Sequence, residues 1–297
     1  MTLQKPQELL FQWLDRRLDP GLAEWLRTQC AQIRDGAPER TLHLSFGLAL
    51  RKVGHAPLSA TSDEQSQAFS GHPGWDLRDW TVDQVARLAL LLALPVSEQS
   101  KRAVLALFQT ADLGEHVALI RGLFLLPQAA DLLHIGREAI RSNMGDVFFA
   151  VTQRNPYAAE HFDDIAWNQM IVKCLFLDLP LRGVFGVDTR TNLDLARMLT
   201  GLARERWAAA RPISPEAWRC VAPFADYASG AAGNIATDAA SVLKDALHKD
   251  PSDRRGAALA LWNTGRLADR AYVREAAPEL VARLEAGTLS WENHEHD

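Results

Sequence analysis

Cysteine is scarce in this sequence. The 297 residues include only Cys30, Cys174 and Cys220, and no two of them lie close enough for a C-x-x-C metal or redox motif. An odd and scattered set of cysteines indicates a reducing compartment rather than a disulfide framework. Cys174 lies within an apolar run, so we expect it to be a small core residue.

Long hydrophobic runs and a strong excess of one charge are also missing. The longest apolar run, Leu88–Val96, is far shorter than the roughly 20 residues that span a bilayer, and the N-terminus has no signal-peptide pattern. The 32 basic and 37 acidic residues give a net charge of -5, which does not suggest nucleic acid or anionic lipid as a partner. We therefore expect a cytoplasmic protein that binds no nucleic acid and does not insert directly into a membrane.

The motifs of several enzyme classes are absent as well. The sequence contains no G-x-x-x-x-G-K-[ST], no G-x-G-x-x-G after a strand, no H-E-x-x-H and no G-x-S-x-G. The nine histidines show no ligand spacing, and we expect His116 and His134 to be surface or packed residues. His294, Glu295 and His296 could chelate a stray divalent ion, but we expect neither a functional metal nor a cofactor.

The segment "DDIAW" invites comparison with the aspartate-rich D-D-x-x-D cluster of terpene synthases. It offers Asp163 and Asp164, but Trp167 stands where the third aspartate would be. Hard cations such as Mg²⁺ need several carboxylate oxygens. We therefore expect these two aspartates to cap the N-terminus of a helix, where their charge also suits the helix dipole.

Helical periodicity runs through the whole chain, and alternating strand patterns are almost absent. Gly/Pro breaks divide the pattern into about a dozen helices, so the sequence predicts an all-α fold of antiparallel helix pairs. The segment "HKDPSDRRGAALALWNTG" resembles one half of a HEAT-type repeat. It indicates HEAT-like, solenoid character toward the C-terminus.

Composition predicts four regions. Residues 1–55 form an N-terminal helical segment, and residues 56–79, rich in Ser, Gly, Pro and Gln, read as a loop or linker. Residues 80–290 form the main α-helical domain, which begins with the capping-box signature "TVDQ". Residues 291–297 are polar and are expected to form a frayed tail.

One apolar segment, "DDIAWNQMIVKCLFLDLPLRGV" from Asp163 to Val184, carries polar side chains in its middle. Gln169 and Lys173 are four residues apart and share one stripe of the predicted helix, with Asn168 beside them. Burying an ammonium group is costly without an anion or several acceptors. Lys173 therefore either reaches solvent or pairs with a core carboxylate, or the three side chains line a pocket that binds a ligand oxyanion or carbonyl.

Neighbouring segments supply further polar candidates for such a pocket. The arginine-rich segment that follows is most simply interpreted as a solvated helix face with intrahelical ion pairs. Alternatively, its arginines contribute to a ligand site. Polar residues at helix ends, where pockets of α-helical folds usually open, add to the set. The candidate ligand-binding residues are Asn143, Asn155, Tyr157, Asn168, Gln169, Lys173, Arg190, Arg197 and Arg206.

These segments together resemble EboA domain proteins. The resemblance covers roughly residues 80–225 and is carried by "REAIRSNMGDVFFAV", "NPYAAEHFDDIAWNQMIVKCLFLDLPL" and "LARMLTGLARERWAAARPISPEAWRCVAPF". It implies a bacterial gene cluster that also encodes a prenyltransferase-like membrane protein and sugar-modifying enzymes. That cluster is linked to secondary metabolism and, in cyanobacteria, to export of a scytonemin precursor. The resemblance assigns no catalytic residue.

Three functional hypotheses follow. The first is a cofactor-free component of a small-molecule pathway that binds a polar intermediate or a partner enzyme in an α-helical pocket. The second is a metal-independent enzyme acting on a cyclitol- or sugar-like intermediate, in which Lys173 or an arginine stabilises an oxyanion and Glu205 or Asp188 acts as acid or base. The third is an α-solenoid adaptor without a ligand.

The ligand hypotheses predict that Lys173→Met leaves the fold intact and abolishes pathway output. Methionine keeps an unbranched side chain but removes the charge that would hold a ligand. Circular dichroism reports the fold, and product levels in cells carrying the gene cluster report the output. If Lys173→Met unfolds the protein, the lysine belongs to a structural ion pair instead.

Overall fold

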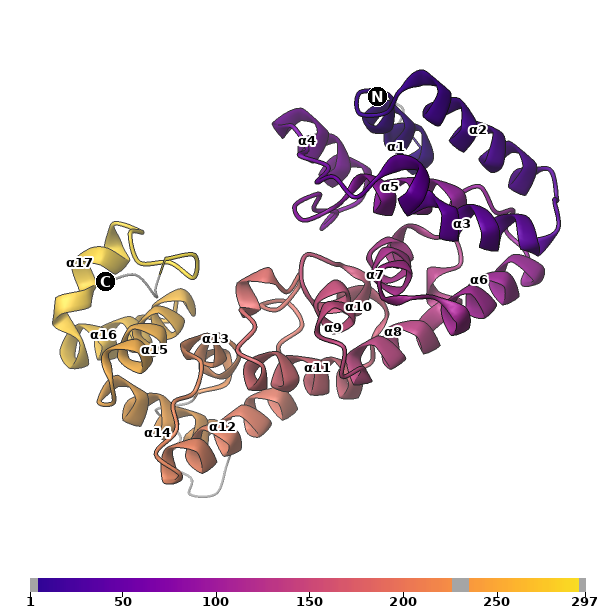
Figure 1. Cartoon of the computed structure of the whole chain (residues 1–297). Helices are drawn as coiled ribbons and strands as arrows, with labels where there is room; N and C mark the ends of the chain where they lie inside the picture. Colours follow the sequence, from indigo (N-terminus) through magenta and orange to yellow (C-terminus); the bar gives the residue numbers. More distant parts are fainter. Residues whose placement is uncertain (1–4, 226–234, 294–297) are drawn as a thin grey trace. The chain divides into compact units, whose positions relative to one another are not determined.

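The computed structural model describes residues 5–225 and 235–293, and these residues form an all-α protein (Figure 1). The α-helices are α1 (Pro6–Asp15), α2 (Pro20–Arg34), α3 (Glu39–Val53), α4 (Ser62–Gly71), α5 (Val82–Leu91), α6 (Glu98–Thr110), α7 (Leu113–Gly122), α8 (Leu133–Arg141), α9 (Gly145–Thr152), α10 (Tyr157–His161), α11 (Asp164–Phe176), α12 (Leu193–Ala208), α13 (Trp218–Val221), α14 (Ile235–Leu247), α15 (Pro251–Asn263), α16 (Leu267–Ala276) and α17 (Pro278–Glu285). Short 3-10 helices are η1 (Leu123–Leu125), η2 (Ala129–Leu132), η3 (Leu181–Gly183), η4 (Pro215–Ala217) and η5 (Ala222–Phe224). The predicted fold class is confirmed.

Extended backbone contributes little to this part of the chain. Within it, the β-type pairing is an isolated bridge between Pro57 and Thr81. None of the helices described is both long enough and apolar enough to cross a membrane. All three cysteines are buried, as predicted for Cys174.

Helix ends follow the capping signals in the sequence. Asp163 is the N-cap of α11, and its carboxylate accepts a hydrogen bond from the Ala166 amide at 2.8 Å, which confirms the capping role predicted for this residue. α11 ends at Phe176, earlier than the apolar pattern to Val184 suggested. Asp178 has a left-handed backbone with φ of 53°, and Pro180 follows it, so the helix cannot continue.

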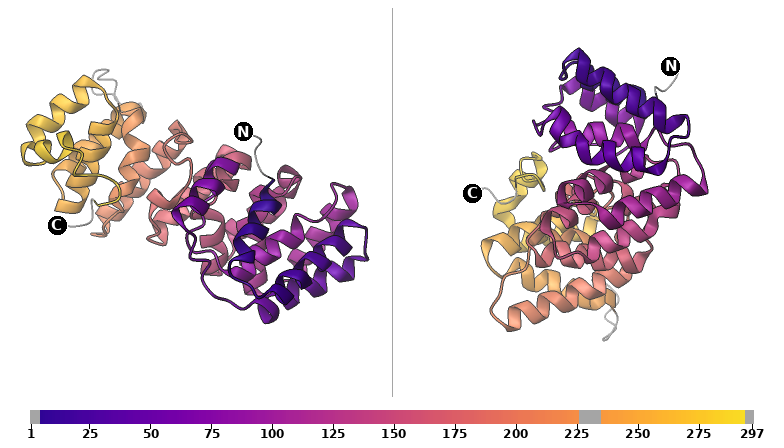
Figure 2. Two further views of the ribbon diagram at one scale, coloured as in Figure 1. Left: turned by 90° about the horizontal axis from the view of Figure 1, so that it is seen from above. Right: turned by 45° about the vertical axis from the view of Figure 1, so that its right-hand side comes forward.

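The chain divides into two compact units, residues 1–162 and 163–297. In the first unit, α5 packs against α1, α2, α3 and α7, and α2 lies beside α3, as both views of Figure 2 show. α5 is buried along its whole length, including the side chains of Asp83 and Arg87. Arg87 donates a hydrogen bond to the Asp83 carboxylate at 2.6 Å and another to the Phe46 carbonyl oxygen. The opposite charges of Asp83 and Arg87 therefore compensate each other in the core.

In the second unit, α15 packs against α13, α14, α16 and α17. The Asp250 carboxylate caps α15 by accepting hydrogen bonds from the amides of Ser252 and Asp253. Gly256 allows close packing there, because a Cβ at this position would lie 2.5 Å from the Pro215 Cβ. The HEAT-like segment thus forms a capped helix within a helical cluster. Solenoid character remains a prediction.

A buried carboxylate accompanies α15. Asp253 is only 2% exposed and accepts hydrogen bonds from the indole N–H groups of Trp207 and Trp218 at 3.1 and 3.2 Å. Burial raises the pKa of Asp253 to about 6, because the charged form is poorly solvated there. The two indoles tie α12 and α13 to the start of α15.

The predicted loop at residues 56–79 contains α4, which the sequence reading missed. Thr61 and Glu64 form a capping box at its N-terminus, a signal present in the letters "TSDE". Only Glu64 and Ala68 of α4 are buried. The segment therefore shows no apolar periodicity from which a helix could be predicted. The division between units falls after Phe162 rather than within this segment.

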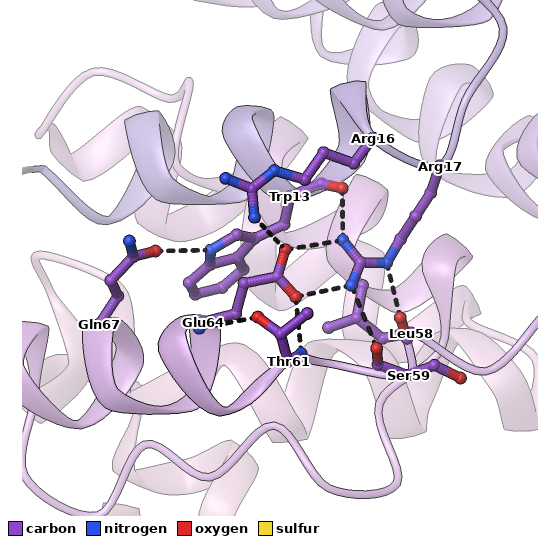
Figure 3. Close-up of polar contacts among 8 residues, drawn as sticks. All are labelled: Trp13, Arg16, Arg17, Leu58, Ser59, Thr61, Glu64 and Gln67. Atoms are coloured by element: carbon purple, nitrogen blue, oxygen red, sulfur yellow. Dashed lines mark hydrogen bonds and ion pairs between the residues drawn. The ribbon is translucent and has the colours of Figure 1, made fainter.

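Glu64 also attaches α4 to α1 (Figure 3). Its side chain is buried and accepts hydrogen bonds from Arg16 at 2.9 Å and from Arg17 at 2.6 and 3.0 Å. Arg17 also donates to the carbonyl oxygens of Leu58 and Ser59. The Arg17 hydrogen bond is the main reason that the pKa of Glu64 falls to about 2.

The predicted frayed tail begins with packed residues. Trp291 is 9% exposed, and the Arg219 guanidinium lies 5.1 Å from the centroid of its ring. This arrangement allows a cation–π contact. His294, Glu295 and His296, the weak metal candidates, lie outside the residues that the structure describes.

The Glu64 ion pairs predict a defined pH dependence of stability. Because the folded-state pKa is lowered from 4.5 to about 2, the stabilisation is present above pH 4.5 and is lost as the pH falls from about 4.5 to about 2. The shift corresponds to about 3 kcal/mol at neutral pH. We expect Glu64→Gln to lower the free energy of unfolding by about that amount, and the difference from wild type to shrink below pH 4.5. Urea unfolding across this pH range measures it, and parallel curves would contradict the assignment.

Candidate functional site

Two predicted site residues of the first unit are parts of its core. The Asn155 amide is 3% exposed and donates to the carbonyl oxygens of Ile120 and Ala150 at 3.1 and 2.8 Å. Its own oxygen accepts from the Tyr157 amide. The Tyr157 hydroxyl donates to the Ala129 carbonyl oxygen at 2.9 Å. These hydrogen bonds hold the turn between α9 and α10 in place, whereas Asn143 is exposed between α8 and α9.

Asn168 has a comparable role in the second unit. It is 5% exposed and forms a reciprocal pair of amide hydrogen bonds with Asn192, at 3.1 and 2.8 Å. Asn192 is the N-cap of α12 and also accepts from the Leu195 amide. The pair therefore joins the middle of α11 to the start of α12.

The predicted arginines lie in separate environments. Arg190 pairs with Asp164 at 3.0 Å, and its guanidinium lies 5.0 Å from the Trp167 ring centroid. Arg197 pairs with Asp194 on the exposed surface of α12. Arg206 donates to a backbone carbonyl oxygen at position 212 and lies 5.9 Å from the centroid of the Phe176 ring.

The two carboxylates proposed as acid or base are also separated. Asp188 accepts two hydrogen bonds from Arg219, at 2.8 and 2.6 Å. Glu205 is exposed on α12. A buried carboxylate nearby, Glu216, accepts from the backbone and side chain of Arg182. These pairs connect the segment between α11 and α12 to η4 and α13.

Gln169 and Lys173 are the predicted site residues that meet in one hollow. They line an open groove between α11 and α12, and the rest of its lining is apolar: Val172, Phe176, Leu177 and Met198. Neither Asp188 nor Glu205 is among the lining residues. Partial burial lowers the pKa of the Lys173 ammonium. The groove thus presents one cation within an apolar surface.

A larger and more polar cavity lies in the first unit. We call it the loop pocket, because it opens between the loop before α4 and the loop that leads to α5. Its lining residues are Pro57, Ser59, Ala60, Thr61, Ser62, Gln65, Ser66, Leu77, Arg78, Asp79, Trp80, Thr81 and Arg154. None of the residues predicted from sequence lines it.

Ion pairs and backbone strain concentrate at this pocket. Arg154 forms an ion pair with Asp79 and lies 3.8 Å from the carboxylate of Asp76. The same Asp76 carboxylate accepts two hydrogen bonds from Nε of Arg78 and one from its Nη2. Ser59, Asp79 and Arg154 have positive φ angles of 49°, 65° and 53°. Such left-handed conformations are unfavourable for residues with a Cβ.

Local sequence signals did not reveal the loop pocket. The capping box at Thr61 marks the start of α4, and "HPG" and "RD" mark turns, but none of these patterns shows that Arg154 lies against Asp79. The residues that line the pocket come from three separate stretches of the chain. Only the packing of the first unit brings these stretches together.

Asn155 is buried and Asn143 is exposed, so we expect their substitution to change stability by different amounts. Asn155→Ala removes three hydrogen bonds and leaves buried backbone carbonyl groups unsatisfied, so it should lower the free energy of unfolding by about 1–3 kcal/mol. Asn143→Ala is the matched control at an exposed position, with an expected change within about 0.5 kcal/mol. Chemical denaturation measures both. Equal effects would show that Asn155 is not a structural residue.

Comparison with known proteins identifies the family. A family model described as "Metabolite traffic protein EboA" matches residues 6–222. The match includes the N-terminal helices and the loop pocket, beyond the segments whose motifs carry the resemblance. Searches of curated proteins and of solved structures give no match. The sequence motifs and the family model agree, and the chain belongs to the EboA family.

Proposed function

We propose that this EboA protein is a cytoplasmic binding component of metabolite traffic in secondary metabolism, and that it holds a small polar molecule in the loop pocket. The description of the family supports a role in metabolite traffic. The pocket supports a role in binding, since its lining combines charged, polar and apolar side chains.

The observation that carries the proposal is the concentration of strain at the pocket. Three non-glycine residues with left-handed backbone, Ser59, Asp79 and Arg154, all line it. Each such conformation costs of order 1 kcal/mol and persists only where the surrounding structure enforces it. Strain of this kind gathers at ligand sites because it presents side chains and backbone groups in directions that regular structure does not.

The charges in the wall favour a polar ligand over a highly charged one. Arg154 is neutralised by Asp79, and Arg78 by Asp76. Each ion pair still offers donors and acceptors at its edges. Trp80 and Leu77, both buried, are apolar members of the lining.

Binding has more support than catalysis. The two carboxylates whose pKa values move furthest, Glu64 and Asp253, do not line the loop pocket. A general acid or base should lie in the pocket with a pKa near neutrality. The enzyme alternative places Lys173 beside Glu205 or Asp188, but neither carboxylate lines the groove of Lys173.

The proposal predicts that a metabolite extract from cells carrying the gene cluster raises the melting temperature of the full chain. A ligand at 100 times its Kd stabilises the folded state by about 2.7 kcal/mol, which corresponds to a shift of several degrees. Arg154→Gln should lose most of this shift, because glutamine cannot reproduce the guanidinium contacts at the pocket wall. Differential scanning fluorimetry measures the effect.

Arg197→Gln is the matched control. Arg197 is likewise an ion-paired arginine, but it does not line the loop pocket, so its variant should shift as much as wild type. Melting temperatures without extract correct for any change in basal stability. An equal shift in all three proteins, or none in wild type, would refute binding in the loop pocket.

A further inference from the structure

The ion pair between Arg154 and Asp79 lies in the wall of the loop pocket and is partly open to solvent. Both residues line the pocket, and their side chains are 32% and 49% exposed. An exposed ion pair adds little to stability, because water competes with each partner for the other. A ligand can therefore replace the contact between these two side chains with little loss of stability.

Each member of the pair is also held by a second residue. Nε of Arg154 lies 3.8 Å from the Asp76 carboxylate. On the other side of the pair, Arg121 of α7 donates a hydrogen bond to the backbone carbonyl oxygen of Asp79 at 2.6 Å. Neither contact depends on the one between Nη1 of Arg154 and the Asp79 carboxylate. Both residues thus stay anchored when that contact opens.

Opening the contact presents one charge of each sign to the pocket. An anionic ligand would pair with Arg154 and leave the Asp79 carboxylate without a cation, and a cationic ligand would leave Arg154 without an anion. A neutral molecule would pair with neither charge. A zwitterion offers a carboxylate to Arg154 and an ammonium group to Asp79, so two charge-assisted contacts replace one. It also has no net charge, which suits a wall of paired charges.

The contact between Arg154 and Asp79 limits how far apart the charges of the ligand can lie. In an α-amino acid the carboxylate and the ammonium group are bonded to the same carbon, so they can meet two adjacent side chains. The lining also includes the apolar residues Pro57, Ala60 and Leu77, and the pocket has a volume of about 870 Å³. An amino acid with an apolar side chain fits such a mixed lining.

We propose that the loop pocket binds an α-amino acid, or a derivative that keeps both charges, an inference that rests on the proposed function and names the class of the small polar molecule. The carboxylate of the ligand pairs with Arg154, and its ammonium group pairs with Asp79. Asp76 and Arg121 are positioning residues that hold this pair in the wall. The internal ion pair and the two contacts with the ligand are alternatives, so neither charge is left bare.

Four small molecules test this class by isothermal titration calorimetry on the full chain. L-leucine carries both charges on one carbon, N-acetyl-L-leucine keeps only the carboxylate, L-leucinamide keeps only the ammonium group, and ε-aminocaproate carries both charges far apart. We expect wild type to bind L-leucine about tenfold more tightly than each of the other three. No binding of L-leucine, or equal affinity for L-leucine and any of the others, would overturn the proposal.

Two variants separate the two ends of the ligand. Asp79→Asn removes the site for the ammonium group and releases Arg154, so its affinity for L-leucine should fall about tenfold while its affinity for N-acetyl-L-leucine rises above that of wild type. Arg154→Gln should also lose L-leucine, and it should gain affinity for L-leucinamide. Asparagine tolerates the left-handed backbone of position 79, and circular dichroism checks the fold of both variants.

Asp194→Asn is the matched control. Asp194 also forms an ion pair with an arginine, Arg197, but it does not line the loop pocket, so its variant should bind every probe as wild type does. If Asp79→Asn loses L-leucine without gaining N-acetyl-L-leucine, then Asp79 has only a structural role and the proposal fails.

A chemically treated metabolite extract separates this inference from the proposed function. Acetic anhydride converts the amines of the extract to neutral amides, so the acetylated extract should no longer raise the melting temperature of wild type. A shift that survives acetylation would overturn the amino acid as ligand and leave binding in the loop pocket standing. No shift with either extract would overturn both.

Discussion

A polar group that is buried between helices must find a hydrogen-bond partner, and this requirement organises both units of the protein. Asn155 holds the turn after α9, Asn168 joins α11 to the cap of α12, and Trp207 donates to the buried Asp253. Asn155, Asn168 and Trp207 belong to the segments that carry the family resemblance, whereas Asp253 lies outside them. Asn155 and Asn168 are buried and Trp207 is partly buried. All three form hydrogen bonds within the protein, so much of the motif serves architecture.

The same requirement explains why α4 exists. Its sequence has few apolar residues, and helix propensity alone would not keep so short a segment folded. The Glu64 carboxylate, held by Arg16 and Arg17, attaches α4 to α1 (Figure 3). Removing one member of such a buried set leaves the others unpaired, which is more costly than the net gain of forming the set. The loop pocket is bounded by α4 and therefore depends on this attachment.

Polar side chains at the two hollows behave differently from those in the core. In the loop pocket, strained backbone and paired charges present donors and acceptors to the cavity. In the groove between α11 and α12, Lys173 and Gln169 lie within apolar surface. The two hollows therefore differ in how polar their linings are.

The all-α class and the cap at Asp163 could be predicted from the sequence, because helix periodicity and capping involve residues only three or four positions apart. The stripe of Gln169 and Lys173 was also predictable for that reason. The partners of Asn155 and Asn168 were not, since Ile120 and Asn192 are distant along the chain. The loop pocket was missed because Ser59, Asp79 and Arg154 meet only after the first unit has packed. Local interactions determine which segments become helices. Contacts between side chains that are distant along the chain depend on tertiary packing. That packing decides which polar residues are structural and which face a cavity.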